Sequence, residues 1–229
     1  FASFCGKNEI LKNNKHSSND ICCLGRSMIE MLGVLAIIGV LSVGGIAGYS
    51  KAMETWKINK MTEQYSYLIQ GLIEIKNNII TSHHIGSLSD VVVAMNLVPK
   101  TWQATGGTMG NYPTAFIDAY GNAINVFTRR EDNGQRIVID FYLGGINNDK
   151  QSLNFSKKFC MSLMQNTIQP LHSTLYYTRL VHLWNDKHIY YGSQFCEGNR
   201  ICLNNLTLSD LKEICDSCKG TACGIVLEL

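Results

Sequence analysis

The chain opens with a polar stretch and then changes to an apolar one. Residues 1–25 are mostly polar, whereas no charge occurs from Met31 to Tyr49. From Met28 the sequence consists mainly of Leu, Ile, Val, Ala and Gly for about twenty residues, enough for a helix to span the roughly 30 Å hydrocarbon core of a bilayer. The pattern predicts a transmembrane helix over 28–49. A buried core helix and a cleaved secretory signal are the alternatives, although the apolar region of a signal is usually shorter.

The apolar run continues into an amphipathic segment. Residues 28–82 contain no proline, and large apolar residues recur at helical spacing in the second half of this range. They are Met53, Trp56, Met61, Tyr65, Leu68, Leu72, Ile75 and Ile79. Because this spacing places them on one helical face, we predict a single helix of about 55 residues. Its first half is a membrane anchor, and its second half is a spine for a globular head.

The pattern beyond the helix predicts an α+β head. We expect a short helix within 87–102 that Pro99 stops, a glycine-rich loop over 105–122, and a helix over 154–166. A further helix is expected over 207–218, with Ser209 as its cap, and a last strand over 222–229. Alternating residues predict two hairpins, 122–130 with 135–143 and 174–184 with 188–195. The predicted fold class is α+β, a long N-terminal helix packed on a C-terminal antiparallel sheet.

The nine cysteines fall into two groups that the apolar run separates. Cys5, Cys22 and Cys23 precede the run, and the C-terminal third contains Cys160, Cys196, Cys202, Cys215, Cys218 and Cys223. An even number on one side of a membrane predicts three disulfides in an oxidising compartment, with reduced buried thiols as the alternative. The sequence leaves their pairing open, and the fold class therefore includes a disulfide-tied loop region.

The CxxC of Cys215 and Cys218 has two other interpretations. With Cys202 and Cys223 it would suit zinc, but the sequence has no second CxxC at finger spacing. A redox centre would require a thioredoxin-like βαβ setting, which the pattern does not predict. We expect no metal site.

Charge and composition limit the classes of function that the sequence supports. The net charge is +2, without a long basic run, and this gives no support to nucleic-acid binding. A hydrophobic content of 45% with 17% charged residues is typical of a chain that folds. We find no catalytic constellation, so we expect no enzyme and no cofactor. Because the first residue is Phe, we also expect the natural start to lie upstream.

The segment "GRSMIE", from Gly25 to Glu30, leads directly into the apolar run. It resembles the prepilin peptidase site of type IV pilins and the related pseudopilins. In that family a cytoplasmic leader ends in glycine, and a glutamate is the fifth residue after it. The resemblance implies a leader at 1–25, cleavage between Gly25 and Arg26, and N-methylation of the new amine. Glycine suits such a site because its backbone fits a tight cleft.

Glu30 has a physical role under this interpretation. A carboxylate within the bilayer costs about 2.5–3.5 kcal/mol on insertion scales, so it usually has a partner. The resemblance implies that the partner is the new amine of Arg26 in a neighbouring subunit, which would set the stagger between helices. The alternative is that Glu30 lies at the interface and reaches water.

The head also resembles the family, more loosely. "VVVAMNLVP" at 91–99 and "DAYGNAINV" at 118–126 are similar to type IVb pilins, in which a short helix ends in proline before the sheet. The resemblance places Cys160 where the first cysteine of a disulfide-closed C-terminal loop is expected. Two features depart from the pattern. Arg26 replaces the usual apolar first residue, and six C-terminal cysteines exceed the usual pair.

The resemblance implies a bacterial pilin with a leader at 1–25, a helix at 26–82 and a head at 83–229. Its precursor would lie in the inner membrane, be processed by a prepilin peptidase and methylase, and pass to the pilus assembly machinery. It would then polymerise with itself into an extracellular filament for adhesion, aggregation, motility, conjugation or DNA uptake, with a host or cell surface as a further partner. The alternatives are a type II secretion pseudopilin and a non-polymerising single-pass protein with a disulfide-rich ligand-binding ectodomain.

Overall fold

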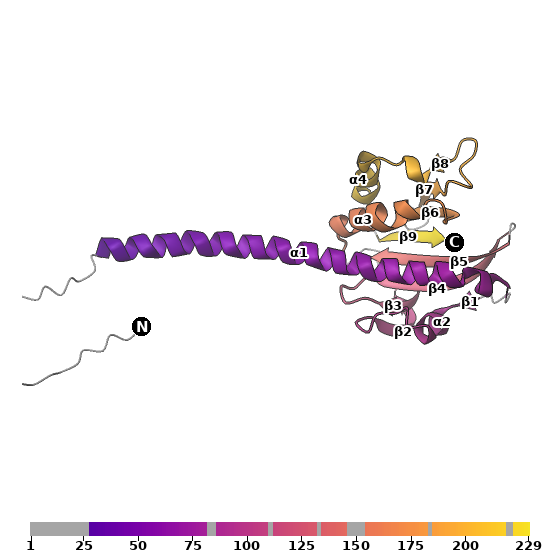
Figure 1. The fold of residues 1–229 in the computed structure, drawn as a ribbon, viewed down its shortest axis with the longest axis horizontal. Coiled ribbons are helices and arrows are strands. Elements are labelled where there is room, and N and C mark those ends of the chain that lie inside the picture. The colour runs from indigo at the N-terminus through magenta and orange to yellow at the C-terminus, as the bar shows by residue number, and fades with distance from the viewer. Residues whose placement is uncertain are drawn as a thin grey trace, which may run out of the picture. The chain divides into compact units, whose positions relative to one another are not determined.

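The computed structural model describes residues 28–81, 86–109, 112–131, 134–145, 154–182, 185–218 and 222–229. The first element is α1, a helix over Met28–Thr81, which confirms the single long helix predicted over 28–82 (Figure 1). The chain divides within this helix into two compact units, Phe1–Ser50 and Lys51–Leu229. Gly25, Arg26 and the three N-terminal cysteines lie outside the described residues.

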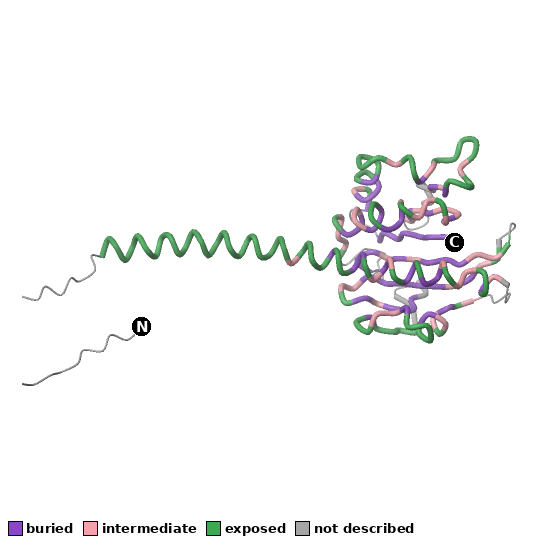
Figure 2. The backbone as a smooth tube through the Cα atoms, viewed as in Figure 1, coloured by how far each residue is buried: buried purple, intermediate pink, exposed green. Residues whose placement is uncertain are grey.

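The part of α1 in the first unit presents its side chains to the surroundings. Every residue of 28–50 is exposed, as the green tube of Figure 2 shows. Leu32 is 65% exposed and Val40 is 74% exposed, values that are unusual for large apolar side chains in water. By length and composition this helix is apolar enough to cross a membrane.

The second unit is built on one sheet. The strand order is β2-β3-β4-β5-β9-β6-β7-β8, and β1 pairs with β4. The strands are β1 (Gly86–Ser87), β2 (Gln103–Met109), β3 (Tyr112–Ile117), β4 (Ala123–Glu131), β5 (Gly134–Leu143), β6 (Tyr177–His182), β7 (Asn185–Tyr191), β8 (Ile201–Cys202) and β9 (Cys223–Glu228). Neighbouring strands are antiparallel, as predicted, except that the short β8 is parallel to β7.

The last strand lies in the middle of the sheet. β9 pairs with β5 on one side and with β6 on the other, and Glu228 faces Val138 and Tyr177 in the two registers. All six residues of β9 are buried, which explains its nearly continuous apolar sequence. In Figure 2 the purple of buried residues follows this strand. β9 thus joins the two predicted hairpins, β4–β5 and β6–β7, into one sheet.

The second half of α1 supplies the centre of the core. Tyr65, Leu68, Ile69 and Leu72 are 0% exposed. The ring of Tyr65 lies 4.7 Å from that of Phe141 in β5, and its other ring neighbours are Trp102 and Phe159, each at 5.3 Å. Because these ring neighbours come from three separate segments, the predicted amphipathic spine is confirmed as the packing surface of the head. Trp56, which the spacing places on the same face, is 56% exposed, so the prediction is wrong for this residue.

Short helices complete the second unit. The α-helices are α2 (Ser89–Ala94), α3 (Lys157–Leu163) and α4 (Leu208–Asp216). A π-helical turn, η1 (Met164–Ile168), continues α3 and is followed by the 3-10 turn η2 (Gln169–Leu171); η3 (Leu203–Asn205) precedes α4. The helix predicted over 154–166 is therefore α-helical over only seven residues.

The prediction of a loop over 105–122 is wrong, because this range contains most of β2 and all of β3. Glycine and proline, which usually mark loops, occur here within strands. Gly106 has φ +57°, and the register between β2 and β3 shifts between Ala104 and Gly107. Glycine is thus used at a bulge, where a positive φ is needed, and not to end the strand.

Pro99 does not end α2, contrary to prediction. The helix stops at Ala94, and the chain turns at Asn96, whose φ is +55°. The short amide side chain of asparagine tolerates this left-handed conformation, which terminates helices. The turn is therefore complete before the proline is reached.

The cap of α4 is Thr207 and not the predicted Ser209. The Thr207 side chain accepts a hydrogen bond from the Asp210 N–H, and the Thr207 N–H donates to Asp210 Oδ2 at 2.8 Å. This reciprocal capping box requires an acidic or amide residue three positions after the cap. Asp210 satisfies that spacing for Thr207, which leaves Ser209 inside the first turn.

The second hairpin is confirmed, but its turn is not where the sequence predicts it. Residues 185–187, expected as the turn, belong to β7. Strand β7 pairs with β6, and His182 faces Asn185 in the register. Residues 183 and 184 lie outside the described part of the chain.

Candidate functional site

Glu30 lies in the first turn of α1 and is exposed. It is the only charged residue of the segment 28–50. A carboxylate in the first turn favours the helix, because the N-terminal end of the helix dipole is positive. The position also leaves the carboxylate available to a cation outside the helix.

The same half of α1 has five glycines. A Cβ atom added at Gly33, Gly39, Gly44, Gly45 or Gly48 would meet nothing within 4 Å. Glycines on an apolar helix let a second helix approach closely in lipid. This surface of α1 is therefore suited to packing against another apolar helix as well as to contact with lipid.

The six C-terminal cysteines form the three disulfides that their even number predicts. The pairs are Cys160–Cys215, Cys196–Cys202 and Cys218–Cys223. The first bridge joins α3 to α4, and the third joins the end of α4 to β9. Two disulfides therefore attach α4 and the residues just after it to the rest of the head.

The two cysteines of the CxxC bind different partners. Cys215 pairs with Cys160, and Cys218 pairs with Cys223. A sulfur atom in a disulfide is not a thiolate ligand, so zinc binding at this CxxC is inconsistent with the structure. A redox pair would require a bond between Cys215 and Cys218 themselves.

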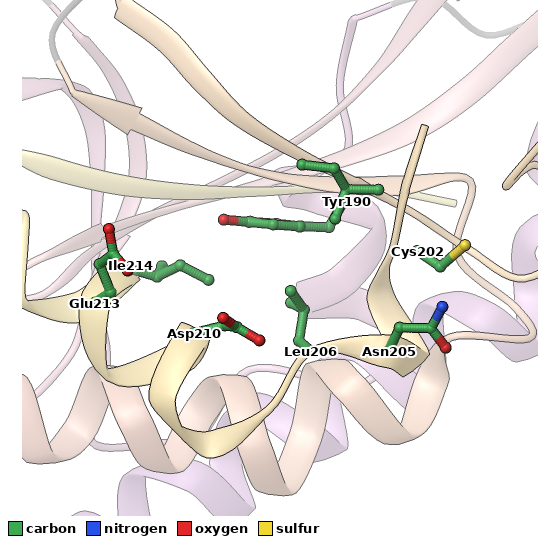
Figure 3. Close-up of a pocket in the computed structure, with 8 residues that line it drawn as sticks. Tyr190, Cys202, Asn205, Leu206, Asp210, Glu213 and Ile214 are labelled. Atoms are coloured by element: carbon green, nitrogen blue, oxygen red, sulfur yellow. The ribbon is translucent and has the colours of Figure 1, made fainter. Parts of the chain in front are cut away.

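A cavity of about 280 Å³ lies between β7, β8, η3 and α4 (Figure 3). Its lining residues are Tyr190, Ile201, Cys202, Asn205, Leu206, Asp210, Glu213 and Ile214. In Figure 3 the Tyr190 ring crosses the cavity, with its hydroxyl toward Glu213 and Ile214, and Leu206 and Asp210 lie across from the ring. Cys202 and Asn205 stand at the other end of the cavity.

The charge at this cavity is negative. Asp210 and Glu213 are three positions apart on α4 and therefore lie on the same face of the helix. Burial raises the pKa of Tyr190 to about 12, with repulsion from the Asp210 and Glu213 carboxylates as the further causes. The hydroxyl of Tyr190 therefore stays protonated at neutral pH.

A second hollow, of about 370 Å³, has the opposite charge. It is lined by Lys76, Gln135, Arg136, Tyr176, Phe195, Arg200 and Leu229. Burial lowers the pKa of Lys76, and the charge of Arg136 lowers it further. The two arginines already have partners within the head. Arg136 lies 3.2 Å from the centre of the Tyr176 ring and 3.6 Å from Glu228, while Arg200 donates to the Phe195 carbonyl at 2.9 Å.

The acidic cavity was not predicted from the sequence. Tyr190 lies on a strand and Glu213 on a helix, and no motif connects the two. The spacing of Asp210 and Glu213 was an available signal, since it predicts two carboxylates on one helical face. What that face would meet depended on the position of β7, which the hairpin pattern alone did not give.

Comparison with known proteins finds no protein family, no curated protein and no solved structure that matches this chain.

Proposed function

We propose that the protein is the structural subunit of a type IV pilus, similar to type IVb pilins. Its precursor resides in the bacterial inner membrane, is cleaved after Gly25 by a prepilin peptidase and is methylated at the amine of Arg26. The assembly machinery then polymerises it into an extracellular filament for adhesion, aggregation, motility, conjugation or DNA uptake. In the filament the head faces outward.

One observation carries this proposal. Glu30 is the fifth residue after Gly25 and begins an uncharged helical segment, and the same helix continues into the core of the head. An ordinary membrane anchor requires neither the glutamate nor this continuity. A subunit that is stored in a membrane and then packed by its helix into a filament uses both.

The exposed half of α1 supports the proposal physically. Its large apolar side chains need an apolar environment, which lipid supplies to the precursor and neighbouring helices supply to the filament. Transfer of the helix from the membrane to the filament would remove the interfacial water that contacts Glu30. A paired amine would then offset the cost of the uncompensated carboxylate.

A second candidate is a membrane-anchored ectodomain that binds a ligand and never polymerises. The cavity beside α4 is the observation that favours it. This protein would retain its N-terminus, and its surface display would not depend on Glu30.

The test of the proposal is assembly of Glu30→Ala in cells that contain the prepilin peptidase and pilus assembly machinery. Filaments sheared from the cells are sedimented and compared with the wild type. We expect the variant to be processed and to stay in the membrane, with filament yield reduced at least about tenfold by the unpaired Arg26 amine. The control is Glu63→Ala, which removes an exposed carboxylate paired with Lys60 elsewhere on α1. Equal filament yields from the two variants would contradict the proposed role of Glu30.

A further inference from the structure

The acidic cavity between β7, β8 and α4 has the features of a small binding site. Ile201, Leu206 and Ile214 give it apolar walls, and the ring of Tyr190 adds an aromatic one. We propose that it binds an alkyl chain ending in a primary ammonium group, the chemistry of a lysine side chain or a free aliphatic amine. This inference does not depend on whether the chain polymerises.

The carboxylates at the cavity lack a basic partner within the described part of the chain. Glu213 forms no ion pair or hydrogen bond there through its carboxylate, and Asp210 uses Oδ2 to accept from the Thr207 N–H and hydroxyl, each at 2.8 Å. The third acid of α4 differs, because Asp216 pairs with Lys157 and with Lys212. The negative charge of α4 is thus neutralised at Asp216 and left uncompensated at the cavity.

The aromatic wall favours a cation as well. The face of a tyrosine ring attracts an ammonium group within about 6 Å of the ring centre. Tyr190 is only 5% exposed, so its ring is held in place by the surrounding residues. The Tyr190 hydroxyl is neutral at neutral pH, so the negative charge at the cavity comes from Asp210 and Glu213.

The volume and the lining of the cavity indicate which class of cation it would bind. A volume of about 280 Å³ is at the lower limit of the roughly 300–1,000 Å³ typical of pockets for drug-sized ligands. A calcium ion coordinated by protein takes six to eight oxygen ligands, whereas this cavity offers two carboxylates and three of its lining side chains are aliphatic. An alkylammonium group matches both the walls and the charge of the cavity, since its alkyl stem contacts the aliphatic side chains and its ammonium group meets the carboxylates.

The test is isothermal titration calorimetry on the full chain in detergent micelles. The probe is Nα-acetyl-lysine N-methylamide, and its neutral counterpart is Nα-acetyl-norleucine N-methylamide, which keeps the stem and removes the charge. For a ligand of about fourteen non-hydrogen atoms we expect a Kd on the order of 1 mM. The norleucine compound should bind at least about tenfold more weakly, because it leaves the carboxylates unpaired.

Two variants distinguish binding in the cavity from non-specific attraction to the negative charge of the protein. Glu213→Gln should weaken binding about fivefold, the effect of losing one exposed charge pair. Glu197→Gln removes an exposed carboxylate that does not line the cavity, and its affinity should remain within about twofold of the wild type. No measurable binding, equal affinity for the norleucine compound, or equal losses in the two variants would overturn the inference.

A further titration with 1,5-diaminopentane distinguishes the two sources of the ligand. Affinity equal to that of the lysine compound would support a free amine as the ligand. Affinity at least about tenfold weaker would support a lysine side chain within a peptide, because the amide groups then contribute to binding.

Discussion

Tyr65 in α1 and Asp118, which follows β3, are joined by a buried hydrogen bond. The Tyr65 hydroxyl donates to Asp118 Oδ2 at 3.1 Å, and Asn122 Nδ2 donates to the same oxygen at 2.7 Å. Asn122 in turn accepts from the Gly144 N–H at 2.7 Å. This network ties the long helix to the ends of β3 and β5. Burial, followed by the nearby Asp118 carboxylate, raises the pKa of Tyr65 well above its usual value, so Tyr65 remains a donor.

Tyr65→Phe should lower the free energy of unfolding of the head by about 1–2 kcal/mol, because a buried carboxylate loses one donor. Chemical denaturation of the full chain in micelles measures this change. Tyr67→Phe is the control, since Tyr67 is 53% exposed on the same helix and should change stability by less than about 0.5 kcal/mol. Similar losses in the two variants would show that the network does not stabilise the helix on the head.

The disulfides should contribute unequally to stability. Cys160 and Cys215 are 55 positions apart, whereas Cys196 and Cys202 are only six apart. By chain entropy, replacing both members of the first pair with alanine should cost about 4 kcal/mol, against about 2 kcal/mol for the second pair. Burial of Cys160 and Cys215 adds to this difference. Denaturant unfolding of the two double variants measures it, and a larger loss from the short bridge would reverse the expected order.

The capping box of α4 predicts a local effect. Thr207→Ala should lower stability by about 1 kcal/mol, because the N–H of Asp210 loses its acceptor. Ser209→Ala, two positions later, should change stability by no more than about 0.5 kcal/mol. Thermal unfolding of both variants under the same conditions distinguishes the two residues. If Ser209→Ala were the more damaging change, Thr207 would not be the functional cap.

Asp140 predicts a pH dependence of stability. Burial raises its pKa from 3.8 to about 6, although Arg179, Arg129 and a hydrogen bond from Tyr142 oppose the shift. The folded protein therefore holds a proton at Asp140 between about pH 4 and pH 6 that the unfolded chain has released. The stability this proton contributes is present below about pH 4 and is lost as the pH rises through about 6, by an amount on the order of 2–3 kcal/mol.

Asp140→Asn imitates the protonated carboxyl at every pH. The stability of this variant relative to the wild type should therefore increase from pH 4 to pH 7, as measured by denaturant unfolding at intervals of pH. Asp90→Asn, an exposed change on α2, should give a nearly constant difference over the same range. A constant difference for Asp140→Asn would mean that Asp140 titrates normally in the fold.

The strongest local patterns predicted the fold best. The 54-residue α1 was predicted because it has no proline and because its apolar spacing is helical over many turns. Strands β4 and β5 were predicted because alternation flanks a clear turn. By contrast, β2 and β3 contain the glycines and the proline that usually mark loops, and their pairing, which no local signal encodes, overrides that preference.

Long-range relationships could not be predicted from the sequence. The strand over 222–229 was expected, but its place between β5 and β6 depends on pairing across the whole head. Likewise, the number of disulfides follows from the count of cysteines, whereas the partner of Cys160 depends on α3 meeting α4. The acidic cavity is of the same kind, since Tyr190 and Glu213 come together only through the packing of α4 near β7.

The central claim is that the chain is a prepilin processed after Gly25. The most direct test is the intact mass and N-terminal sequence of the full chain after co-expression with an active prepilin peptidase, with Gly25→Val as the uncleaved control, because a branched side chain does not fit a tight cleft. We predict that the wild-type chain begins at a methylated Arg26 and that the variant retains residues 1–25. A wild-type chain that keeps these residues, in cells whose peptidase cleaves a known pilin, would contradict the claim and favour the membrane-anchored ectodomain.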